Sequence, residues 1–487
     1  MELLLKSSLF LVTIHAVIVG CVGVRVIMRR AARGIALSWL LLVATFPYVG
    51  AILYLLVGER RIGRARAQGL NELRADFRGI AAATIPADFA AVDWSALPPA
   101  AQALDRLGRS LVGGATVRGN SFELLSDTQA ILAAIVRDVD AAKSSVLMEF
   151  YIWNEGGAAD DVLEAVIRAA GRGVQCRLLV DAMGARPWWK GNQPKRLRDA
   201  GVQLHAALPV GLLRTFIGRT DLRLHRKIVV IDGVAAWTGS MNLVDPRYFK
   251  QDSGVGEWVD AMVRLEGPVV NPLAATQIGD WILETREPVQ PLIGSACLGS
   301  ARPTGTANVQ VVPSGPGETG DGLLQMLLGL INAAQRELVL TTPYLVPDDA
   351  VIVALRGAAG RGVAVTLVLP EKVDSFLTRY ASRSYYDDLL EAGVVIQLYR
   401  GGLLHTKSMS VDGAMSMFGT VNLDMRSLWL NYEVALFVYQ PEFTQALRGL
   451  QQSYVEQSAR VDTASWGARP FRERLLENTL RLLSPLL

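Results

Sequence analysis

One short pattern occurs twice in this chain, and it limits the fold more than any other feature. The two copies, His225-x-Lys227-x4-Asp232 and His405-x-Lys407-x4-Asp412, start 180 residues apart. Each copy continues in the same way, with Gly239-Ser-Met-Asn242 after the first and Gly419-Thr-Val-Asn422 after the second. Since the chain has only four histidines, chance does not account for both copies. The chain is therefore an internal duplication of two similar units.

Helix-like and strand-like segments alternate within each half. In the first half they cover residues 128–142, 145–153, 160–170 and 175–181, and in the second half 323–334, 337–345, 349–359 and 364–369. This order predicts an α/β fold whose parallel or mixed sheets are covered by helices. The repeated patterns fall on predicted strands, where His and Lys two residues apart share a face. Two tandem repeats related by a pseudo-twofold axis are expected.

The amino-terminal region is much more apolar than the rest. Residues 9–28 and 35–57 are each long enough to cross about 30 Å of hydrocarbon, so we predict that residues 1–66 form a retained transmembrane hairpin. The other predicted parts are a neck (67–115), the first repeat (116–287), a Pro/Gly/Ser-rich linker (288–316) and the second repeat (317–487). The chain ends in an amphipathic helix, 471–487, which either closes the core or contacts lipid.

The charge distribution separates possible partners. Residues 1–66 contain nine Lys and Arg against two Asp and Glu, a net charge of +7, and since the whole chain carries +3 the remainder carries −4. A body that binds nucleic acid through phosphates is expected to be basic, so no nucleic-acid partner is predicted. Lys6 and the arginines after the second apolar segment favour a cytoplasmic body by the positive-inside rule. The three cysteines have no metal or disulfide spacing.

The repeated residues suit cleavage of a phosphodiester. One imidazole attacks phosphorus and the other, protonated, donates to the leaving oxygen. Lys227 and Lys407, helped by Asn242 and Asn422, hold the phosphate, so the scheme requires no metal and no cofactor. The carboxylates predicted to orient the histidines are Glu433, 28 residues after His405, and Asp260, 35 residues after His225. Asp232 and Asp412 are placed with the catalytic residues, although a role in turns is equally open.

These residues resemble the phospholipase D superfamily, whose signature is a duplicated H-x-K-x4-D followed by G-x-x-N. Longer segments are similar to bacterial cardiolipin synthases of the A type: 238–249, 255–260, 341–344, 402–407, 419–427 and 484–487. The resemblance covers nearly the whole chain. It implies two phospholipase D-like repeats after a transmembrane hairpin, in a multi-pass protein of the bacterial inner membrane.

The resemblance also implies a reaction and roles. Two phosphatidylglycerol molecules give cardiolipin and glycerol, with the lipid bilayer as the other partner. His225 is implied as the nucleophile and His405 as the acid and base, while 149–153 and Asp181-x-x-Gly184 form pocket walls. Leu345 and Ala185 depart from the family pattern, which expects an aromatic and a hydroxyl residue there.

Three other functions remain open at this point. A hydrolase of the same fold would let water resolve the intermediate. A nuclease is disfavoured by the hairpin and the acidic body, and an inactive scaffold is disfavoured because both patterns are intact. Which histidine is the nucleophile, the membrane side of the active site, oligomeric state, acyl-chain preference and use of phosphatidylethanolamine as donor are left open.

Overall fold

The computed structural model describes most of the chain in two units. Described are residues 2–29, 33–58, 66, 68–70, 72, 87–210, 219, 221–288, 292, 297–299, 302–317, 320–482 and 484. One unit comprises Met1–Ala65 and Val210–Asp221, and the other comprises Arg66–Pro209 and Leu222–Leu487. The repeated patterns both belong to the second unit, so the two predicted repeats are parts of one body.

The described amino-terminal residues of the first unit are mostly helical. They form α1 (Glu2–Met28), α2 (Arg33–Thr45), α3 (Pro47–Leu53) and a π-helical turn, η1 (Tyr54–Gly58), which pack around Val22, Val26, Val43 and Tyr54. The predicted second helix, 35–57, is interrupted at Phe46, because Pro47 has no N–H to continue the helical hydrogen bonding. No helix among the described residues meets the length and hydropathy needed to cross a bilayer.

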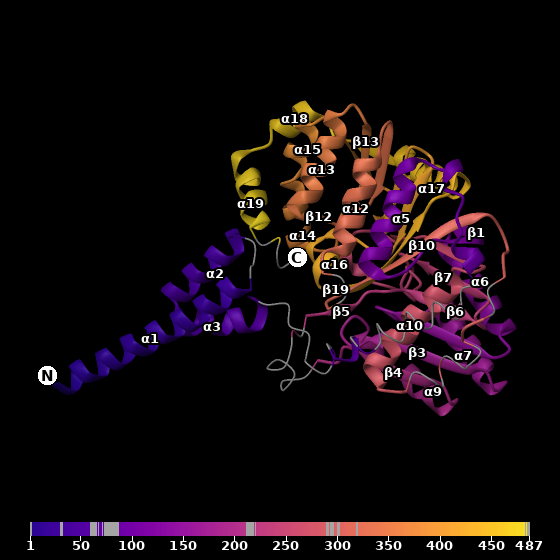
Figure 1. Ribbon diagram of the computed structural model, residues 1–487, viewed down its shortest axis with the longest axis horizontal. Helices are drawn as coiled ribbons and strands as arrows, with labels where there is room; N and C mark the ends of the chain where they lie inside the picture. Colours follow the sequence, from indigo (N-terminus) through magenta and orange to yellow (C-terminus); the bar gives the residue numbers. More distant parts are fainter. Residues whose placement is uncertain are drawn as a thin grey trace. The chain divides into compact units, whose positions relative to one another are not determined.

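A 16-stranded mixed sheet organises the second unit (Figure 1). From the centre outwards, the first half contributes β1 (Val117–Leu125), β9 (Met262–Glu266), β7 (Ala235–Gly239), β6 (Ile228–Ile231), β2 (Ser145–Phe150), β3 (Gln175–Asp181) and β4 (Gln203–Ala207). The second half contributes β10 (Ala307–Ser314), β19 (Asn431–Val438), β17 (Met415–Gly419), β16 (Ser408–Val411), β11 (Glu337–Thr341), β13 (Ala364–Pro370), β14 (Val395–Tyr399) and β20 (Ser458–Arg460). The β1–β10 pair joins the halves, and corresponding strands follow in the same order on either side.

Helices cover both faces of the sheet. On the first half lie α6 (Thr128–Ala141), α7 (Ala158–Gly171) and α10 (Val270–Thr285), and on the second lie α12 (Gly322–Ala333), α13 (Asp349–Gly360) and α17 (Pro441–Glu456). α6 begins where the Asp127 carboxylate accepts a hydrogen bond from the Ala130 amide. It buries Ile131, Ile135 and Val139 at helical spacing. The predicted helix–strand alternation is confirmed here.

Shorter elements complete the second unit. The helices are η2 (Ala87–Ala90), η3 (Trp94–Ala96), α8 (Arg186–Trp189), α9 (Gln193–Asp199), η5 (Gln251–Ser253), α14 (Phe376–Arg383), α15 (Tyr386–Glu391), α16 (Met425–Trp429), α18 (Thr463–Gly467) and α19 (Phe471–Arg481). The short strands are β5 (Arg223–Leu224), β8 (Trp258–Val259), β12 (Leu345–Val346), β15 (Leu403–Leu404) and β18 (Leu423–Asp424).

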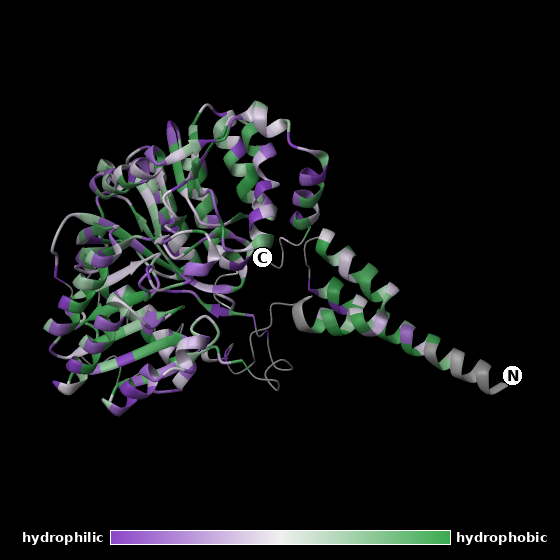
Figure 2. Ribbon diagram, turned by 180° about the vertical axis from the view of Figure 1, so that it is seen from behind, coloured by the Kyte–Doolittle hydropathy of each residue, from purple (hydrophilic) through white to green (hydrophobic). Residues whose placement is uncertain are grey.

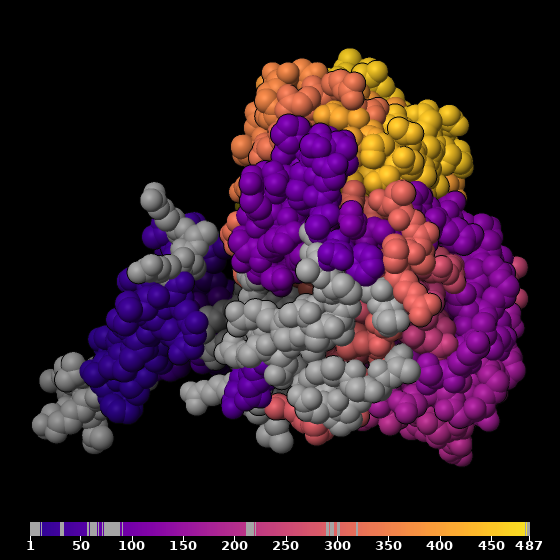
Figure 3. Space-filling view, turned by 45° about the vertical axis from the view of Figure 1, so that its right-hand side comes forward, coloured from indigo at the N-terminus to yellow at the C-terminus, as the bar shows by residue number. Residues whose placement is uncertain are grey.

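The predicted neck, expected to be helical or irregular, and the predicted linker both contain elements of the second unit. The predicted neck contains α5 (Pro99–Val112), whose Ala101 and Leu104 are buried in one core with α12 of the second half. In the space-filling view the purple segment that contains α5 lies against the orange and yellow surface of that half (Figure 3). The predicted linker contains β10, a central strand. Pro313 is tolerated there because β1 pairs with β10 only as far as Val309, which leaves the remainder of β10 paired with β19.

The halves also exchange short strands. β5, which leads into the first histidine pattern, pairs with the start of β19 in the second half. β15, which leads into the second pattern, pairs with β8 in the first half. Each pattern is therefore positioned by a strand from the opposite half.

Candidate active site

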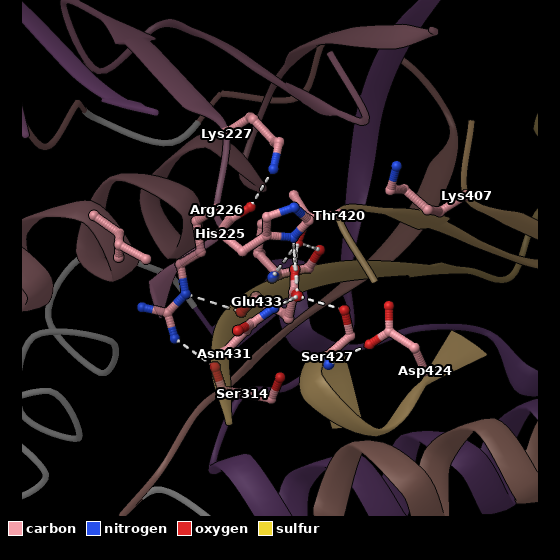
Figure 4. Close-up of polar contacts among 12 residues, drawn as sticks. His225, Arg226, Lys227, Ser314, Lys407, Thr420, Asp424, Ser427, Asn431 and Glu433 are labelled. Carbon is pink, nitrogen blue, oxygen red and sulfur yellow. Dashed lines mark hydrogen bonds and ion pairs between the residues drawn. The ribbon is translucent and has the colours of Figure 1, made fainter. Parts of the chain in front are cut away.

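Each histidine of the duplicated pattern is held by a carboxylate from the other half. The His225 amide donates to the Tyr432 carbonyl at 2.9 Å, and Nδ1 of His225 lies 2.8 and 2.9 Å from the two oxygens of Glu433 (Figure 4). The His405 amide donates to the Val259 carbonyl at 2.8 Å, and its Nδ1 lies 2.7 Å from Oδ1 of Asp260. With Nδ1 engaged in this way, Nε2 of each ring is left for chemistry.

This pairing differs from the pairing within each half that sequence spacing suggests. Both carboxylates are predicted from the sequence, but along the chain Glu433 follows His405 and Asp260 follows His225. The exchange of β5 and β15 between the halves produces the crossed arrangement, because each histidine follows a strand paired with the other half. The histidine patterns also begin before β6 and β16 rather than within them.

Hydroxyl groups fix both carboxylates, and sequence reasoning gave them no role. Ser240 donates to Asp260 at 2.5 Å, and Thr420 donates to Glu433 at 2.6 Å. Ser240 and Thr420 occupy the same position in the two Gly-Ser/Thr-x-Asn segments. Aligning the two repeats would therefore have indicated that both hydroxyl groups have a shared role. Glu433 also accepts hydrogen bonds from Ser427 at 2.7 Å and from the Asn431 amide at 3.2 Å.

The glycine before each hydroxyl residue is required by close packing. A Cβ atom on Gly239 would lie 2.4 Å from the Ala261 carbonyl oxygen, and one on Gly419 would lie 2.4 Å from that of Val434. Both carbonyls belong to residues directly after the orienting carboxylates. The glycines therefore let the hydroxyl-bearing segments approach Asp260 and Glu433.

The two lysines are completely buried beside the histidines. Nζ of Lys227 donates to the His225 carbonyl at 2.6 Å, and Nζ of Lys407 donates to the His405 carbonyl. Asn242 accepts a hydrogen bond from the Ile152 amide at 3.2 Å, while its Nδ2 has no partner among the described residues. In Asn422 it is the side-chain oxygen, Oδ1, that has no partner among the described residues. The two asparagines are thus not equivalent.

Burial sets the protonation of these groups. It lowers the pKa of both His225 and His405 to about 4, although Glu433 and Asp260 act in the opposite direction. It also lowers the pKa of Lys227 to about 8 and that of Lys407 to about 7. Lys407 contributes to the lower pKa of His225, and Lys227 contributes to that of His405. These effects across the halves place the four groups in one electrostatic site.

The orienting carboxylates remain ionised in this setting. Burial alone would raise the pKa of Asp260, but His405 and Lys407 outweigh burial and lower the pKa to about 2. Burial opposes ionisation of Glu433 in the same way, and His225 and Lys227 again lower the pKa. Because the pKa values of the histidines and of the carboxylates are all lowered, each imidazole is neutral and donates a hydrogen bond from Nδ1 to an anionic carboxylate.

Asp232 and Asp412, which the sequence places with the catalytic residues, bind backbone amides at the ends of their strands. Each lies at the opposite end of its strand from the lysine. The Asp232 carboxylate accepts hydrogen bonds from the amides of Lys143, Ser144 and Ser145, each at 2.8 Å. Asp412 accepts from the amides of residues 335–337 at 2.8 to 2.9 Å. The carboxylates stabilise loops that start β2 and β11, which is the turn role left open by the sequence.

The residue after each histidine differs between the two halves. In the first half it is the buried Arg226, which contacts the residue that orients His225, and in the second half it is not an arginine. Arg226 donates from Nε to the Glu433 carbonyl at 2.8 Å and forms an ion pair with Asp280. Thr406 occupies the matching position and hydrogen-bonds the Tyr454 hydroxyl at 3.1 Å. The surroundings of the two histidines are therefore asymmetric.

Aromatic and polar side chains from both halves surround the histidines. The Tyr151 ring packs against His225 with centroids 5.0 Å apart, and Trp258 packs against His405 at 4.4 Å. The Tyr344 hydroxyl donates to Asp374 at 2.9 Å, and Lys250 forms an ion pair with the same carboxylate at 2.9 Å. Burial opposes ionisation of Asp374, but Lys250, with smaller contributions from Tyr344 and His405, lowers the pKa of this carboxylate.

Asp181 and His205 lie at structural positions. Asp181 accepts hydrogen bonds from the Gly184 amide at 2.7 Å and the Leu224 amide at 2.9 Å, so it fixes the strand that leads to His225. His205 is exposed on the edge strand β4, with its ring 5.0 Å from that of Trp281. Among the described residues no three His, Cys, Asp or Glu side chains are grouped to hold a metal ion.

Comparisons with known proteins agree with this geometry. A family model described as cardiolipin synthase, phospholipase D-like domain, matches residues 135–255 and 327–453, and one described as phospholipase D-nuclease N-terminal matches residues 17–59. The cardiolipin synthase A of Erwinia tasmaniensis is 42% identical over 99% of this chain and 98% of its own length. That of Serratia proteamaculans is 41% identical over 96% of each chain. The crystal structure of a Haemophilus influenzae phosphatidylserine synthase matches with a TM-score of 0.61 at 15% identity, covering 79% of this chain and 99% of that one.

Proposed function

Because the chain belongs to the cardiolipin synthase family of phospholipase D-like proteins, we propose that it converts two phosphatidylglycerol molecules into cardiolipin and glycerol. The reaction is a phosphatidyl transfer that runs through a phosphatidyl-histidine intermediate. The observation that carries this proposal is the crossed pairing of His225 with Glu433 and His405 with Asp260. It gives a single site two oriented imidazoles, as a double displacement at phosphorus needs.

The first displacement removes glycerol from one lipid. Nε2 of His225 attacks phosphorus, the bond from phosphorus to the glycerol head-group oxygen breaks, and protonated His405 gives its proton to that oxygen. The anionic phosphate of the bound lipid favours the imidazolium form of His405, whose pKa of about 4 describes the site without substrate. Glu433 stabilises the positive charge that develops on His225.

The second displacement forms the product. The hydroxyl of another phosphatidylglycerol head group loses its proton to His405 and attacks phosphorus, and the bond to Nε2 of His225 breaks. The atoms balance, since two phosphatidylglycerols yield one cardiolipin and one glycerol, and both histidines return to their initial states. Lys227 and Lys407 neutralise the nonbridging oxygens throughout, and the unpaired Nδ2 of Asn242 adds a donor.

Membrane attachment through residues 9–28 and 35–57 is part of the proposal. The length and apolar character of these segments support it, as does the family model that matches residues 17–59. The distribution of positive charge favours a body on the cytoplasmic side of the bacterial inner membrane. Protease accessibility in sealed inverted vesicles tests this orientation.

Product analysis tests the function. Purified protein is supplied with phosphatidylglycerol alone, and the lipids are identified by mass spectrometry. Cardiolipin and glycerol in equal amounts support transfer, whereas phosphatidic acid identifies a hydrolase and contradicts the proposal. His225→Ala and His405→Ala are each expected to abolish synthesis while the thermal melting curve is retained. A phosphatidyl adduct trapped with denaturant at neutral pH on the peptide that contains His225, and absent from His225→Ala, supports His225 as the nucleophile.

A further inference from the structure

We infer that α19 and α14 form a membrane-docking surface that presents the active site to the lipid bilayer, an inference that rests on the proposed function. Figure 1 shows α19 near α14 and α15, and the two helices α14 and α19 are in contact. Figure 2 shows that α19 carries both hydrophilic and hydrophobic turns. What sets α19 apart from a helix that closes a core is which of its side chains are exposed to solvent.

α19 buries Glu477 and Leu480 against the protein and leaves its largest apolar side chains exposed. Glu477 is 1% exposed and accepts hydrogen bonds from Arg383 at 2.6 Å and Arg469 at 3.1 Å. In contrast, Phe471 is 75% exposed, Leu475 is 54% exposed and Leu482, just after the helix, is 79% exposed. A helix that only completes a globular core buries the apolar face instead. Of the two roles that the sequence left open for this segment, the exposure favours contact with lipid.

α14, which contacts α19, also exposes apolar side chains. Phe376 is 61% exposed and Leu377 is 41% exposed at the start of this helix. Arg383 at the end of α14 forms ion pairs with Glu473 and Glu477, which ties the two helices together. An apolar surface shared by two helices in contact has the character of an interaction site.

Charge favours an anionic lipid surface as the occupant. Glu473 and Glu477 are neutralised by Arg383 and Arg469. Arg472 and Arg474 are exposed on the same helix and form no ion pair with a described residue. An amphipathic helix with apolar residues and free arginines binds at the interface of an anionic bilayer, where arginines meet the head groups.

The surface is continuous with the active site along the chain. Asp374, which accepts the Tyr344 hydroxyl and pairs with Lys250, lies two residues before the exposed Phe376. The Lys250 ammonium lies 5.3 Å from the centroid of the Trp258 ring, and that ring packs against His405 with centroids 4.4 Å apart. A lipid whose phosphate lies between the histidines can therefore leave its acyl chains in the bilayer beside α14. Docking would bring the head groups of both substrates to the site without extracting either lipid.

A lipid-quenching experiment on the full-length protein tests this inference. In a Cys21→Ala background the remaining cysteines, Cys176 and Cys297, are buried. Leu475→Cys, Phe376→Cys and the control Val234→Cys are labelled with an environment-sensitive dye and reconstituted into phosphatidylglycerol and phosphatidylethanolamine vesicles. Val234 is 61% exposed in the turn after Asp232, at the end of β6 remote from Lys227. Quenching by nitroxide-labelled lipids at positions 475 and 376, but not at 234, is expected.

Two results would overturn the inference. A dye at position 475 that reports water, as at position 234, shows that the surface is not docked. A dye that reports an apolar environment without quenching by lipid shows that protein, either the amino-terminal helices or a second copy, covers the surface. Each labelled variant is first shown to be active in detergent, which excludes misfolding.

A functional measurement complements the quenching. The double variant Leu475→Glu and Leu482→Glu should lose about tenfold in activity on vesicles, since removing two leucines from an interface weakens binding by at least that factor. Activity on dispersed short-chain phosphatidylglycerol should be unchanged, and Val234→Glu should be unaffected in both assays. Equal losses on both substrates would contradict docking. Product identity is independent of these readouts, so a protein that makes phosphatidic acid would fail the proposed function while the quenching result still decides docking.

Discussion

Replacing Glu433 with glutamine isolates the charge that the second half contributes to His225. The side-chain volume is nearly unchanged, and donors from Thr420 and Ser427 still face the group at 2.6 and 2.7 Å. What is lost is a negative charge 2.8 Å from Nδ1 when the imidazole becomes positive on attacking phosphorus. Two unit charges about 4 Å apart at an effective dielectric constant of about 20 attract by about 4 kcal/mol. Glu433→Gln should therefore lower kcat by about 10³-fold.

The assay follows cardiolipin release from labelled phosphatidylglycerol in mixed micelles, together with thermal unfolding. KM is expected to change little, because the lysines that bind phosphate remain. Glu123→Gln, a carboxylate on the exposed side of β1, provides the control for the substitution itself. A loss below about tenfold in a folded variant would refute the reasoning, since it would mean that the charge of Glu433 is not felt in the transition state.

The remaining predictions concern the lysines, the hydroxyls and the turn carboxylates. The pKa of Lys407 is lowered to about 7 and that of Lys227 to about 8, so kcat/KM should fall as pH rises through this range and the lysines lose their charge. In Lys407→Arg the alkaline limb of the pH profile should move upward towards 8. An alkaline limb that does not move would exclude Lys407 as its source. Thr420→Val should reduce kcat by about 10- to 100-fold by releasing Glu433, whereas Thr420→Ser should restore most of the activity; equal activity of the two variants would show that the hydroxyl has no positioning role. Asp412→Ala should destabilise the protein by about 2 kcal/mol through its unpaired backbone amides, with kcat per folded molecule within about threefold of the parent; a normal melting curve with lost activity would restore Asp412 to the catalytic set.

Local pattern predicted the elements, and long-range pairing decided how they combine. The strand over 175–181 and the helices over 128–142 and 323–334 agree with β3, α6 and α12 to within one or two residues, because periodicity and capping are local properties. β10 was assigned to a linker because its surroundings are rich in proline and glycine. Its identity as a central strand depends on β1 and β19, whose partners lie far away along the chain.

The site shows the same division. Duplication marked His225, Lys227, His405 and Lys407, and all four are buried close together. Spacing along the chain could not predict which histidine each carboxylate contacts. The pairing of β5 with β19 brings together His225 and Glu433, which are 208 positions apart. Asp232 was grouped with the lysine by its place in the pattern, but five residues of extended chain carry it to the opposite end of the strand.

The exchange of β5 and β15 has a consequence for how such a chain can be divided. Neither repeat alone contains a histidine together with the carboxylate that orients it. A protein made of one repeat could be active only as a dimer of identical polypeptides, in which each subunit supplies the carboxylate that orients the histidine of the other. Joining both copies in one chain fixes that partnership at any concentration, and it frees each copy to diverge, as Arg226 and Thr406 already have.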